Sequence, residues 1–324
     1  MSYASHLLND LQFNSENFPS VIENDGSIKT LDEAITFVRS NVDTLKEELS
    51  HTGALLLRGF PVTNADEYDA LFCSFGYPNF TYKESLSNAV RINFTEYVFT
   101  ANEAPKHVEI YLHNEMAQTP IFPNIISLFC ETAAEEGGAT SLCRTDKLYN
   151  AIASSHPDEV AKLEAHGIKY TTTMPAEDAP DSAQGRGWKS TLSVETVSDA
   201  EAKLKELGYS WRWNEDGSLL AQTAALPGVK TVEDGRKVFF NQLIAAYKGW
   251  KGVKENPSGS LCYGDDSAMT ADFLKAMADK AEEILYPLQW QDSDVAIVDN
   301  HLAQHGRKPF SGDRPRKVLV ALGL

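Results

Sequence analysis

Near the start of the chain, apolar residues repeat at the spacing of an amphipathic helix. Over residues 30–50, the 3.6-residue period is carried by Ile35, Phe37, Val38, Val42 and Leu45. The period ends at His51-Thr52-Gly53, and the apolar run 54–57 that follows has the length of a buried strand. A further helix is predicted over residues 66–75. Helices are thus gathered at the start of the chain.

Short strand-like runs make up much of the rest of the chain. Apolar runs of strand length occupy residues 108–112, 124–130, 139–143, 237–240, 294–299 and 317–322. Gly137-Gly138 predicts a tight turn before the third of these runs. We expect Asp146 to cap a helix that runs through Val160, and another helix over residues 270–284. Many short strands with helices before and between them predict an α+β protein built on a β-barrel or sandwich.

The length of 324 residues leaves room for one large domain or two ordinary ones. No internal repeat or low-complexity linker divides the chain, so a single domain over residues 1–324 is predicted. Residues 174–235 are polar and rich in Gly, Ser, Asp and Pro. This composition predicts an insertion or lid within the domain rather than a second core.

Composition and charge narrow the class of protein. The net charge of −17 argues against binding to nucleic acid or to an anionic membrane, because both need a positive surface. The four cysteines form no CxxC pair, which argues against a zinc knuckle or thioredoxin motif and predicts buried thiols. No run approaches the roughly 20 apolar residues of a membrane span, and the N-terminus lacks a signal-peptide core. A cytoplasmic protein is therefore predicted.

Two segments far apart in the sequence carry a candidate metal site. His113 and Glu115 lie at the end of the run 108–112, and residues i and i+2 of a strand share one face. His305 follows the run 294–299 and offers a third ligand, with His301 as its competitor. Two imidazoles and one carboxylate hold non-haem Fe(II) and leave positions for substrates and O₂.

Two alternatives to an oxygenase are compatible with the same side chains. A zinc hydrolase also uses two histidines and a glutamate, but such sites usually have HExxH on a helix, and this chain has no HExxH. A barrel that binds metal or a small molecule without turnover would keep the metal residues alone. It would need neither Arg316 nor Thr140.

The combination of motifs resembles the TauD/TfdA-type Fe(II)/2-oxoglutarate-dependent oxygenases, including their clavaminate-synthase-like branch, over nearly the whole chain. The stretches that carry the resemblance are residues 53–60, 99–115, 137–140, 238–242 and 299–316. The resemblance implies a double-stranded β-helix, a jelly-roll or cupin-like barrel with helices packed outside. It also implies that His113, Glu115 and His305 are the catalytic iron ligands. Aspartate is the commoner residue at the position of Glu115 in this superfamily, but the clavaminate-like branch also uses glutamate. A halogenase would have a small residue at this position, so Glu115 argues against halogenation.

The resemblance further implies 2-oxoglutarate as co-substrate, with an arginine for its distal carboxylate. Arginine suits this role because its planar fork binds a carboxylate through two hydrogen bonds. Arg316 lies at the family spacing after His305, and Arg314, of the same strand parity, is the alternative. Arg307 is better suited to bracing the turn after the histidine. Thr140, after the glycine turn, matches the hydroxyl contact of the family.

Substrate contacts are predicted on both sides of the metal motif. Arg91 could bind a substrate carboxylate, and Asn102 and Glu103 lie in the loop before His113. Asn241 and Gln242 end a strand-like run and could contact substrate or brace the iron site. The resemblance to the clavaminate-like group suggests a small, amino-acid-derived substrate. The ligand set permits hydroxylation, desaturation or oxidative cyclisation, each with release of succinate and CO₂.

Overall fold

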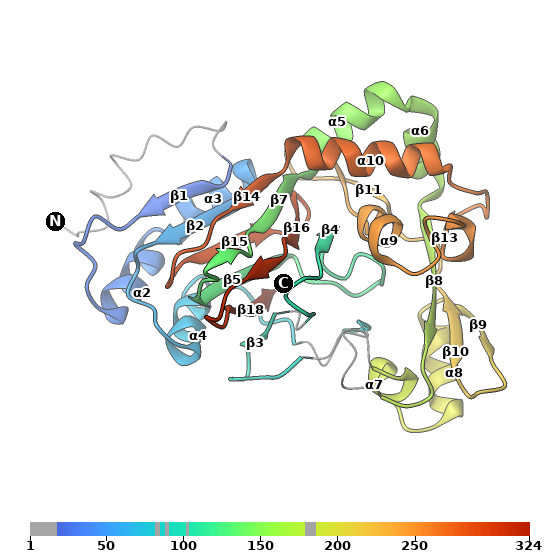
Figure 1. Ribbon diagram of the computed structural model, residues 1–324, viewed down its shortest axis with the longest axis horizontal. Helices are drawn as coiled ribbons and strands as arrows, with labels where there is room; N and C mark the ends of the chain where they lie inside the picture. Colours follow the sequence, from blue (N-terminus) through green and yellow to red (C-terminus); the bar gives the residue numbers. More distant parts are fainter. Residues whose placement is uncertain (1–17, 82–84, 88–90, 102–103, 179–185) are drawn as a thin grey trace.

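The computed structural model describes residues 18–81, 85–87, 91–101, 104–178 and 186–324, and its centre consists of two β-sheets packed face to face (Figure 1). The larger sheet contains, in spatial order, β1 (Ser20–Glu23), β2 (Ala54–Arg58), β15 (Val295–Asp299), β5 (Ile125–Thr132), β18 (Lys317–Gly323) and β3 (Phe99–Thr100). The smaller sheet contains β14 (Tyr286–Leu288), β7 (Thr140–Arg144), β16 (Ala303–Arg307) and β4 (Ile110–His113). The predicted strand runs in these sheets are confirmed.

Alternation of side chains along the strands builds two cores on the larger sheet. On β2, Leu55 and Leu57 point outward into a core that the N-terminal helices cover. Ala54 and Leu56 point inward into the space between the two sheets, where they meet residues of β5, β15, β16 and β18. Because period-2 alternation buries both faces, this strand is apolar at every position but its last, Arg58.

Three helices cover the outer face of the larger sheet: α2 (Leu31–Ser40), α3 (Val42–Thr52) and α4 (Ala65–Cys73). The expectation of one helix over residues 30–50 was wrong, because the helix is interrupted at Asn41. The side chain of Asn41 donates a hydrogen bond to the carbonyl oxygen of Phe37 at 2.7 Å. Asparagine competes in this way for main-chain groups, which disfavours a continuous helix although the apolar period runs on.

Four helices pack outside the smaller sheet: α5 (Thr145–Ser155), α6 (Pro157–His166), α9 (Leu243–Gly249) and α10 (Ala271–Ile284). Asp146 does not cap α5, contrary to expectation, because the helix begins one residue before it. Its carboxylate forms ion pairs with Arg144 and Arg236 instead. The helix also ends before Pro157, so that Val160 belongs to α6, because a proline removes a main-chain donor.

Residues 168–263 add a lobe that lies to one side of the sheets (Figure 1). Its elements are β8 (Ile168–Met174), α7 (Trp188–Leu192), α8 (Val197–Glu206), β9 (Ser210–Trp213), β10 (Leu219–Gln222), β11 (Val229–Thr231), β12 (Lys237–Phe239), a 3₁₀ turn (Pro257–Gly259) and β13 (Leu261–Tyr263). The predicted strand at residues 237–240 is therefore found as β12. Despite its polar composition, the segment has a small core that includes Trp188, Leu204 and Leu219. A lid function for residues 174–235 stays a prediction.

The two glycines Gly137 and Gly138 directly precede β7 of the smaller sheet. Gly137 and Gly138 both have positive φ values, of 71° and 70°, which L side chains rarely adopt. Gly137 lies in the short strand β6 (Glu136–Gly137), which pairs with β17 (Phe310–Ser311). The predicted tight turn was therefore wrong: Gly137 is paired in a ladder, and Gly138 follows it on the way into β7, where Thr140 lies.

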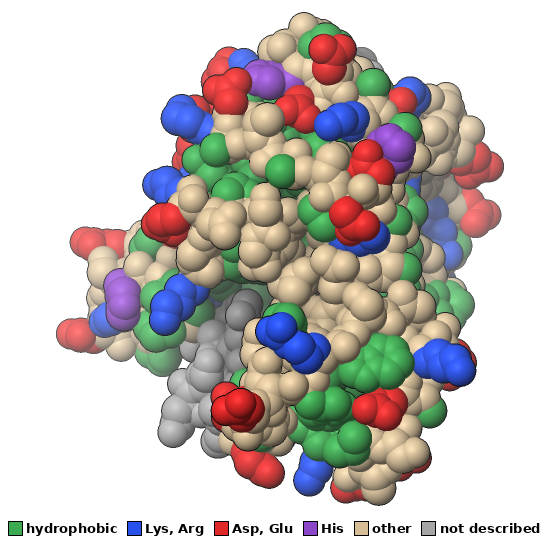
Figure 2. Space-filling model, turned by 90° about the vertical axis from the view of Figure 1, so that its right-hand side faces the viewer, with side chains coloured by type: hydrophobic (Ala, Val, Ile, Leu, Met, Phe, Trp, Pro, Cys, Tyr) green, Lys and Arg blue, Asp and Glu red, His purple; other side chains and the backbone are tan. Residues whose placement is uncertain are grey.

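The surface and the cysteines agree largely with expectation. Figure 2 shows acidic and basic side chains interspersed over one face of the described residues. All four cysteines are free, and three are buried, but Cys73 at the end of α4 is exposed. In the described part of the chain, no helix has both the length and the apolar character needed to cross a membrane.

Candidate active site

Three side chains with metal-binding atoms converge at the end of the smaller sheet. His113 on β4 and His305 on β16 are directly paired across the antiparallel ladder, and their ring centroids are 4.4 Å apart. The Oε2 atom of Glu115 lies 3.4 Å from Nε2 of His113 and 3.5 Å from Nε2 of His305. One ligand atom from each residue lies within 4.8 Å of the others. Two imidazoles and one carboxylate at this spacing fit a single ferrous ion.

Each histidine offers Nε2 to the site. In His113, Nδ1 lies 2.8 Å from the carbonyl oxygen of Tyr111, which can only accept, so Nδ1 carries the proton. This bond leaves the lone pair of Nε2 directed toward Glu115 and fixes the orientation of the ring. Nδ1 of His305 is buried and has no hydrogen-bond partner in the described part of the chain.

The electrostatics favour the protonation states that a metal needs. Burial alone would raise the pKa of Glu115, but His113 and His305, through hydrogen bonding and charge when their Nε2 atoms are protonated, outweigh burial and hold this pKa well below its usual range. Burial, followed by the charges of His113 and Arg91, lowers the pKa of His305, against the opposing effect of Glu115. An ionised carboxylate beside a neutral imidazole is ready to bind a cation without first losing a proton.

Asn300 holds the main chain of the carboxylate ligand. Its side chain has no exposed surface, and its Oδ1 accepts a hydrogen bond from the N–H of Glu115 at 2.7 Å. Its Nδ2 donates to the carbonyl oxygens of Glu115 at 3.0 Å and of Pro123 at 2.7 Å. The position of Glu115 is thus fixed from both sides of its peptide unit.

We expect Asn300→Ala to destabilise the fold and to weaken iron binding. Three hydrogen bonds would be lost and buried main-chain groups left without partners, which lowers the free energy of unfolding by about 2–4 kcal/mol. Iron affinity should fall by about tenfold or more, as for other residues that orient ligands. Denaturant unfolding and ferrous titration measure the two effects. An unchanged iron affinity in the folded variant would show that the hydrogen bonds of Asn300 do not position Glu115 for metal binding.

A buried network of amide side chains lies behind the metal ligands. Oδ1 of Asn114 accepts hydrogen bonds from the main-chain N–H of Asn241 at 3.0 Å and from Nε2 of Gln304 at 3.1 Å. Nδ2 of Asn114 donates to the carbonyl oxygen of Asn300 at 2.6 Å. Gln242 completes the network by donating to the carbonyl oxygen of Asn114 at 3.3 Å. Asn114, between His113 and Glu115, is therefore braced by residues from two distant segments, 241–242 and 300–304.

Two predicted substrate residues belong to this network. Asn241 has no exposed surface. Its Nδ2 donates a hydrogen bond to the carbonyl oxygen of Gly228, and its Oδ1 accepts one from the N–H of Leu243. Of the two roles predicted for Asn241, substrate contact and bracing of the iron site, its position in the structure fits bracing. Gln242 is 7% exposed and borders a separate cavity away from the metal ligands. Asn102 and Glu103 lie outside the described residues.

A small cavity of about 70 Å³ joins the metal ligands to the predicted co-substrate residues. Arg91, Thr140 and Arg316 line it together with the three ligands. Most of the other walls are apolar: Phe99, Ala101, Ile110, Ile126, Leu128, Val318, Val320 and Leu322. Such walls lower the local dielectric constant and strengthen every charge interaction inside the cavity.

Arg316 is the cation at the far end of this cavity. Its Nε donates to the carbonyl oxygen of Gly138 at 3.1 Å, and its guanidinium lies 5.6 Å from the ring centroid of Phe310. Burial, aided by the charge of Arg307, lowers the pKa of Arg316 to about 10, so the side chain is still charged at neutral pH. Among the described residues, no carboxylate forms an ion pair with it. A buried, uncompensated cation of this kind invites an anionic ligand.

Thr140 and the two other arginines have distinct surroundings. Oγ1 of Thr140 accepts a hydrogen bond from Nε1 of Trp290 at 2.9 Å, which leaves its own proton for an acceptor in the cavity. Arg307 donates to the carbonyl oxygens of Pro105 and Val108 and thereby braces the chain before β4. Arg314 pairs with Asp292 and does not line the cavity. The structure thus brings Arg316, and not Arg314, toward the metal ligands.

Sequence reasoning missed the residues that hold the ligands in place. Asn114, Asn300 and Gln304 carry no motif of their own, and their role depends on contacts between distant segments. Trp290 was missed because its partner Thr140 lies on another strand. One signal was available: strand alternation turns Asn114 away from the metal, and a polar side chain facing inward needs a partner.

His301, the competitor for the distal ligand, lies outside the metal site. Its ring stacks on Phe240 with centroids 4.8 Å apart, and its Nε2 lies 3.0 Å from Oδ1 of Asn124. The ammonium of Lys230 lies 3.8 Å from the ring centroids of Phe122 and Phe240 in the same cluster. Burial, followed by the charge of Lys230, lowers the pKa of His301 to about 4.

We expect His301 to contribute to acid destabilisation. Its pKa is about 4 in the folded chain and about 6.5 when unfolded, so the unfolded state takes up the proton first as pH falls. The stability is present above pH 6.5 and is lost between pH 6.5 and 4, by at most about 3 kcal/mol. Between pH 7 and 4.5, the free energy of unfolding of His301→Phe should fall by about 2 kcal/mol less than that of the wild-type protein. His166 is exposed, so the control variant His166→Phe should show the same pH dependence of unfolding free energy as the wild-type protein. An equal fall in unfolding free energy in both variants would contradict the prediction.

Comparison with known proteins identifies the class to which this fold and site belong. The model of the taurine catabolism dioxygenase TauD, TfdA family matches residues 29–322. A clavaminate synthase-like protein of Arabidopsis thaliana is 34% identical over 319 residues, which cover 96% of this chain and 94% of that protein. The dapdiamide synthesis protein DdaC of Enterobacter agglomerans is 26% identical over 290 residues, covering 85% and 84%. The chain therefore belongs to the TauD/TfdA family.

A solved structure supports the fold. The structure of an asparagine oxygenase in complex with Fe(II), 2S,3S-3-hydroxyasparagine and succinate superposes with a TM-score of 0.54 at 13% identity, over 90% of this chain and 83% of that one. The predicted double-stranded β-helix is thus confirmed. As a member of its family, the protein is a non-haem Fe(II)- and 2-oxoglutarate-dependent oxygenase. Fe(II) is its cofactor, and 2-oxoglutarate and O₂ are its co-substrates.

Proposed function

We propose that His113, Glu115 and His305 hold the ferrous ion of this oxygenase, and that Arg316 and Thr140 hold the distal carboxylate of 2-oxoglutarate. The observation that carries this assignment is the convergence of the three ligand atoms and a buried arginine in one cavity. Fe(II) with 2-oxoglutarate supplies the activation of O₂ that oxidises an unactivated C–H bond. Succinate and CO₂ are the products from the co-substrate.

The side chains around the metal have separate tasks. The bond from Nδ1 of His113 to Tyr111 keeps Nε2 directed at the metal position, while the amide network fixes the loop that carries Glu115. Arg316 would bind the co-substrate carboxylate through its guanidinium, and the hydroxyl of Thr140 would donate a hydrogen bond to it. The apolar walls exclude bulk water, which strengthens these charge-assisted bonds.

We further propose that the substrate is a small, amino-acid-derived molecule whose carboxylate binds Arg91. Arg91 lines the same cavity as the metal ligands, so a carboxylate bound there would hold a nearby C–H bond beside the metal. Hydroxylation, desaturation and oxidative cyclisation are all open to this arrangement. Oxygen-consumption assays with amino acids and their amides test the class; stimulation by the amides alone would contradict a role for the carboxylate.

The cytoplasmic location stays a prediction.

An anaerobic titration with Fe(II) and then 2-oxoglutarate tests the assignment of the metal centre. We expect a weak visible charge-transfer band only when both are present, because the band requires the co-substrate to chelate the iron. Succinate, which has no keto group, should produce no band and serves as the control ligand. If the folded protein binds iron but shows no band, the proposed assignment of Arg316 and Thr140 to the co-substrate is contradicted.

A further inference from the structure

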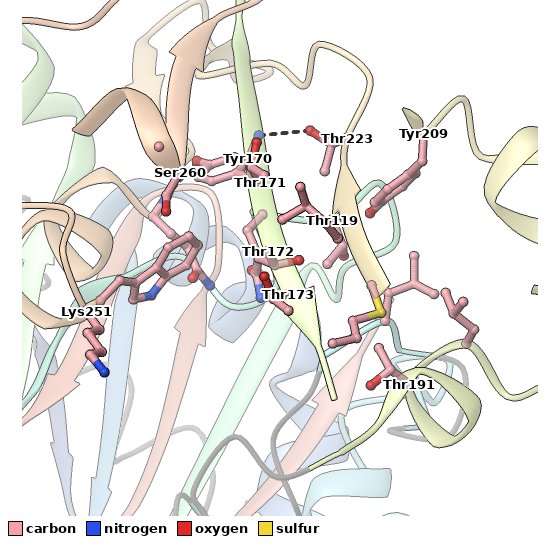
Figure 3. Close-up of a pocket in the computed structure, with 18 of the residues that line it drawn as sticks. Thr119, Tyr170, Thr171, Thr172, Thr173, Thr191, Tyr209, Thr223, Lys251 and Ser260 are labelled. Carbon is pink, nitrogen blue, oxygen red and sulfur yellow. Dashed lines mark hydrogen bonds between the residues drawn. The ribbon is translucent and has the colours of Figure 1, made fainter. Parts of the chain in front are cut away.

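A second and much larger cavity lies away from the metal ligands. It has a volume of about 640 Å³ and surrounds β8 in the lobe at the side of the sheets (Figure 3). It shares no lining residue with the cavity that contains His113, Glu115 and His305. Its volume is in the range of sites that bind small molecules, yet the proposed function gives it no task.

One edge of β8 is uncovered in this cavity. Strand β10 pairs with residues Thr171–Met174 on one side of β8. On the other side, β13 pairs only with Ile168–Tyr170. The last bond on that side runs from the N–H of Thr171 to the carbonyl oxygen of Ser260 at 2.8 Å. Before Ser260 the chain leaves the edge in the 3₁₀ turn Pro257–Gly259, so about three residues of β8 have no neighbour strand on this side among the described residues.

Thr173 presents its main chain to this uncovered edge. Successive residues of a strand direct their N–H and C=O groups to opposite edges. Tyr170 faces β10, since its carbonyl oxygen accepts from the N–H of Thr223 at 3.0 Å, and Thr171 faces β13. Thr173 therefore faces the same side as Thr171, where no strand of the described residues continues. Its N–H and C=O form a donor and acceptor pair to which another extended main chain is complementary.

The side chains around the edge suit an uncharged ligand. Among the described residues that line the cavity, Lys251 is the only charged one, and none is a carboxylate. Hydroxyl groups come from several threonines, and Trp250 and Leu220 add apolar surface. In Figure 3, Lys251 and Ser260 lie on one side of β8, while Thr223 and Tyr209 lie on the other. The uncovered edge thus faces the wall formed by Trp250, Lys251 and Ser260.

We propose that this cavity binds the backbone of a short, extended peptide or peptide-like amide, which continues the line of β13 along the edge of β8. The ligand accepts a hydrogen bond from the N–H of Thr173 and donates one to its carbonyl oxygen. Its small or apolar side chains pack against Trp250. Gln242, which borders the cavity, also bonds the carbonyl oxygen of Asn114 between two metal ligands. The inference goes beyond the proposed function and does not depend on it.

Hydrogen exchange in the presence of a blocked tripeptide tests this inference. Acetyl-trialanine amide added to the whole protein should slow exchange of the Thr173 amide several-fold, because the ligand covers it. The amide of Thr172, which already faces β10, should be unaffected. No metal or co-substrate is needed, so a failure here is distinct from a failure of the iron titration.

A matched pair of variants isolates the main-chain bond. Thr173→Pro removes the N–H without taking a bond from the ladder with β10, whereas Thr173→Ala removes only the side chain. We expect about fivefold to tenfold weaker tripeptide binding in Thr173→Pro and near-normal binding in Thr173→Ala. Equal affinity in both variants, binding of maltotriose in place of the tripeptide, or no protection of Thr173 in the wild type would overturn the inference. If Thr173→Pro fails to fold, the exchange result in the wild type decides.

Discussion

Replacement of His305 by alanine is expected to abolish tight iron binding and oxygenase turnover. His305 provides one of three atoms that converge on the metal position, and it directly faces His113 across the β4–β16 ladder. With two ligands left, the site loses a metal bond as well as one of the two imidazoles that keep Glu115 ionised. Iron affinity should fall by more than the roughly 10- to 100-fold seen when residues that merely orient ligands are changed.

Two assays measure this effect, and a second histidine provides the control. Ferrous titration reports binding, and succinate formation from 2-oxoglutarate reports turnover. His301→Ala removes an imidazole only four positions away that stacks on Phe240 and does not face the metal ligands. That variant should keep iron affinity near the wild-type value. Retained turnover in His305→Ala would show that another residue is the distal ligand.

Replacement of Arg316 by alanine is expected to weaken 2-oxoglutarate binding while iron binding is unchanged. Arg316 is a buried cation that no carboxylate of the described residues neutralises, and it lies in the cavity of the metal ligands. Loss of one partner of a buried charge pair costs about 2–5 kcal/mol, which corresponds to roughly 30-fold or more in affinity. Arg316→Lys should recover only part of this affinity, because an ammonium lacks the planar fork.

Arg314 offers a matched control two positions away. Its side chain pairs with Asp292 at the surface, so Arg314→Ala should leave 2-oxoglutarate affinity nearly unchanged. Anaerobic titration of each iron-loaded variant, followed by the charge-transfer band, compares the two dissociation constants. A larger loss in Arg314→Ala than in Arg316→Ala would transfer the co-substrate role to Arg314.

Local pattern was sufficient to predict six strands of the two central sheets, but it missed β1, β3, β14 and β16. The apolar runs at residues 54–57, 294–299 and 317–322 became β2, β15 and β18 with shifts of one residue at most. Strand pattern is easily read here because these strands are buried on both faces. Local pattern failed where hydrogen bonds of single side chains decided the outcome. Asn41 ended a helix that the apolar period would continue, and Asp146 bonded Arg144 and Arg236 and capped nothing.

The sequence by itself determined the kind of chemistry, through the types of residue at residues 113–115 and 301–316. His301 and His305 were both available, as were Arg314 and Arg316, and local spacing could not separate either pair. Only the tertiary structure places His305 and Arg316, and neither His301 nor Arg314, in one cavity, because this depends on the pairing of β16 with β4 and on which side chain reaches the interior. The amide network around Asn114 and the uncovered edge of β8 have the same origin. Each is made by segments that meet only in the folded chain, and periodicity within one segment carries no information about its distant partner.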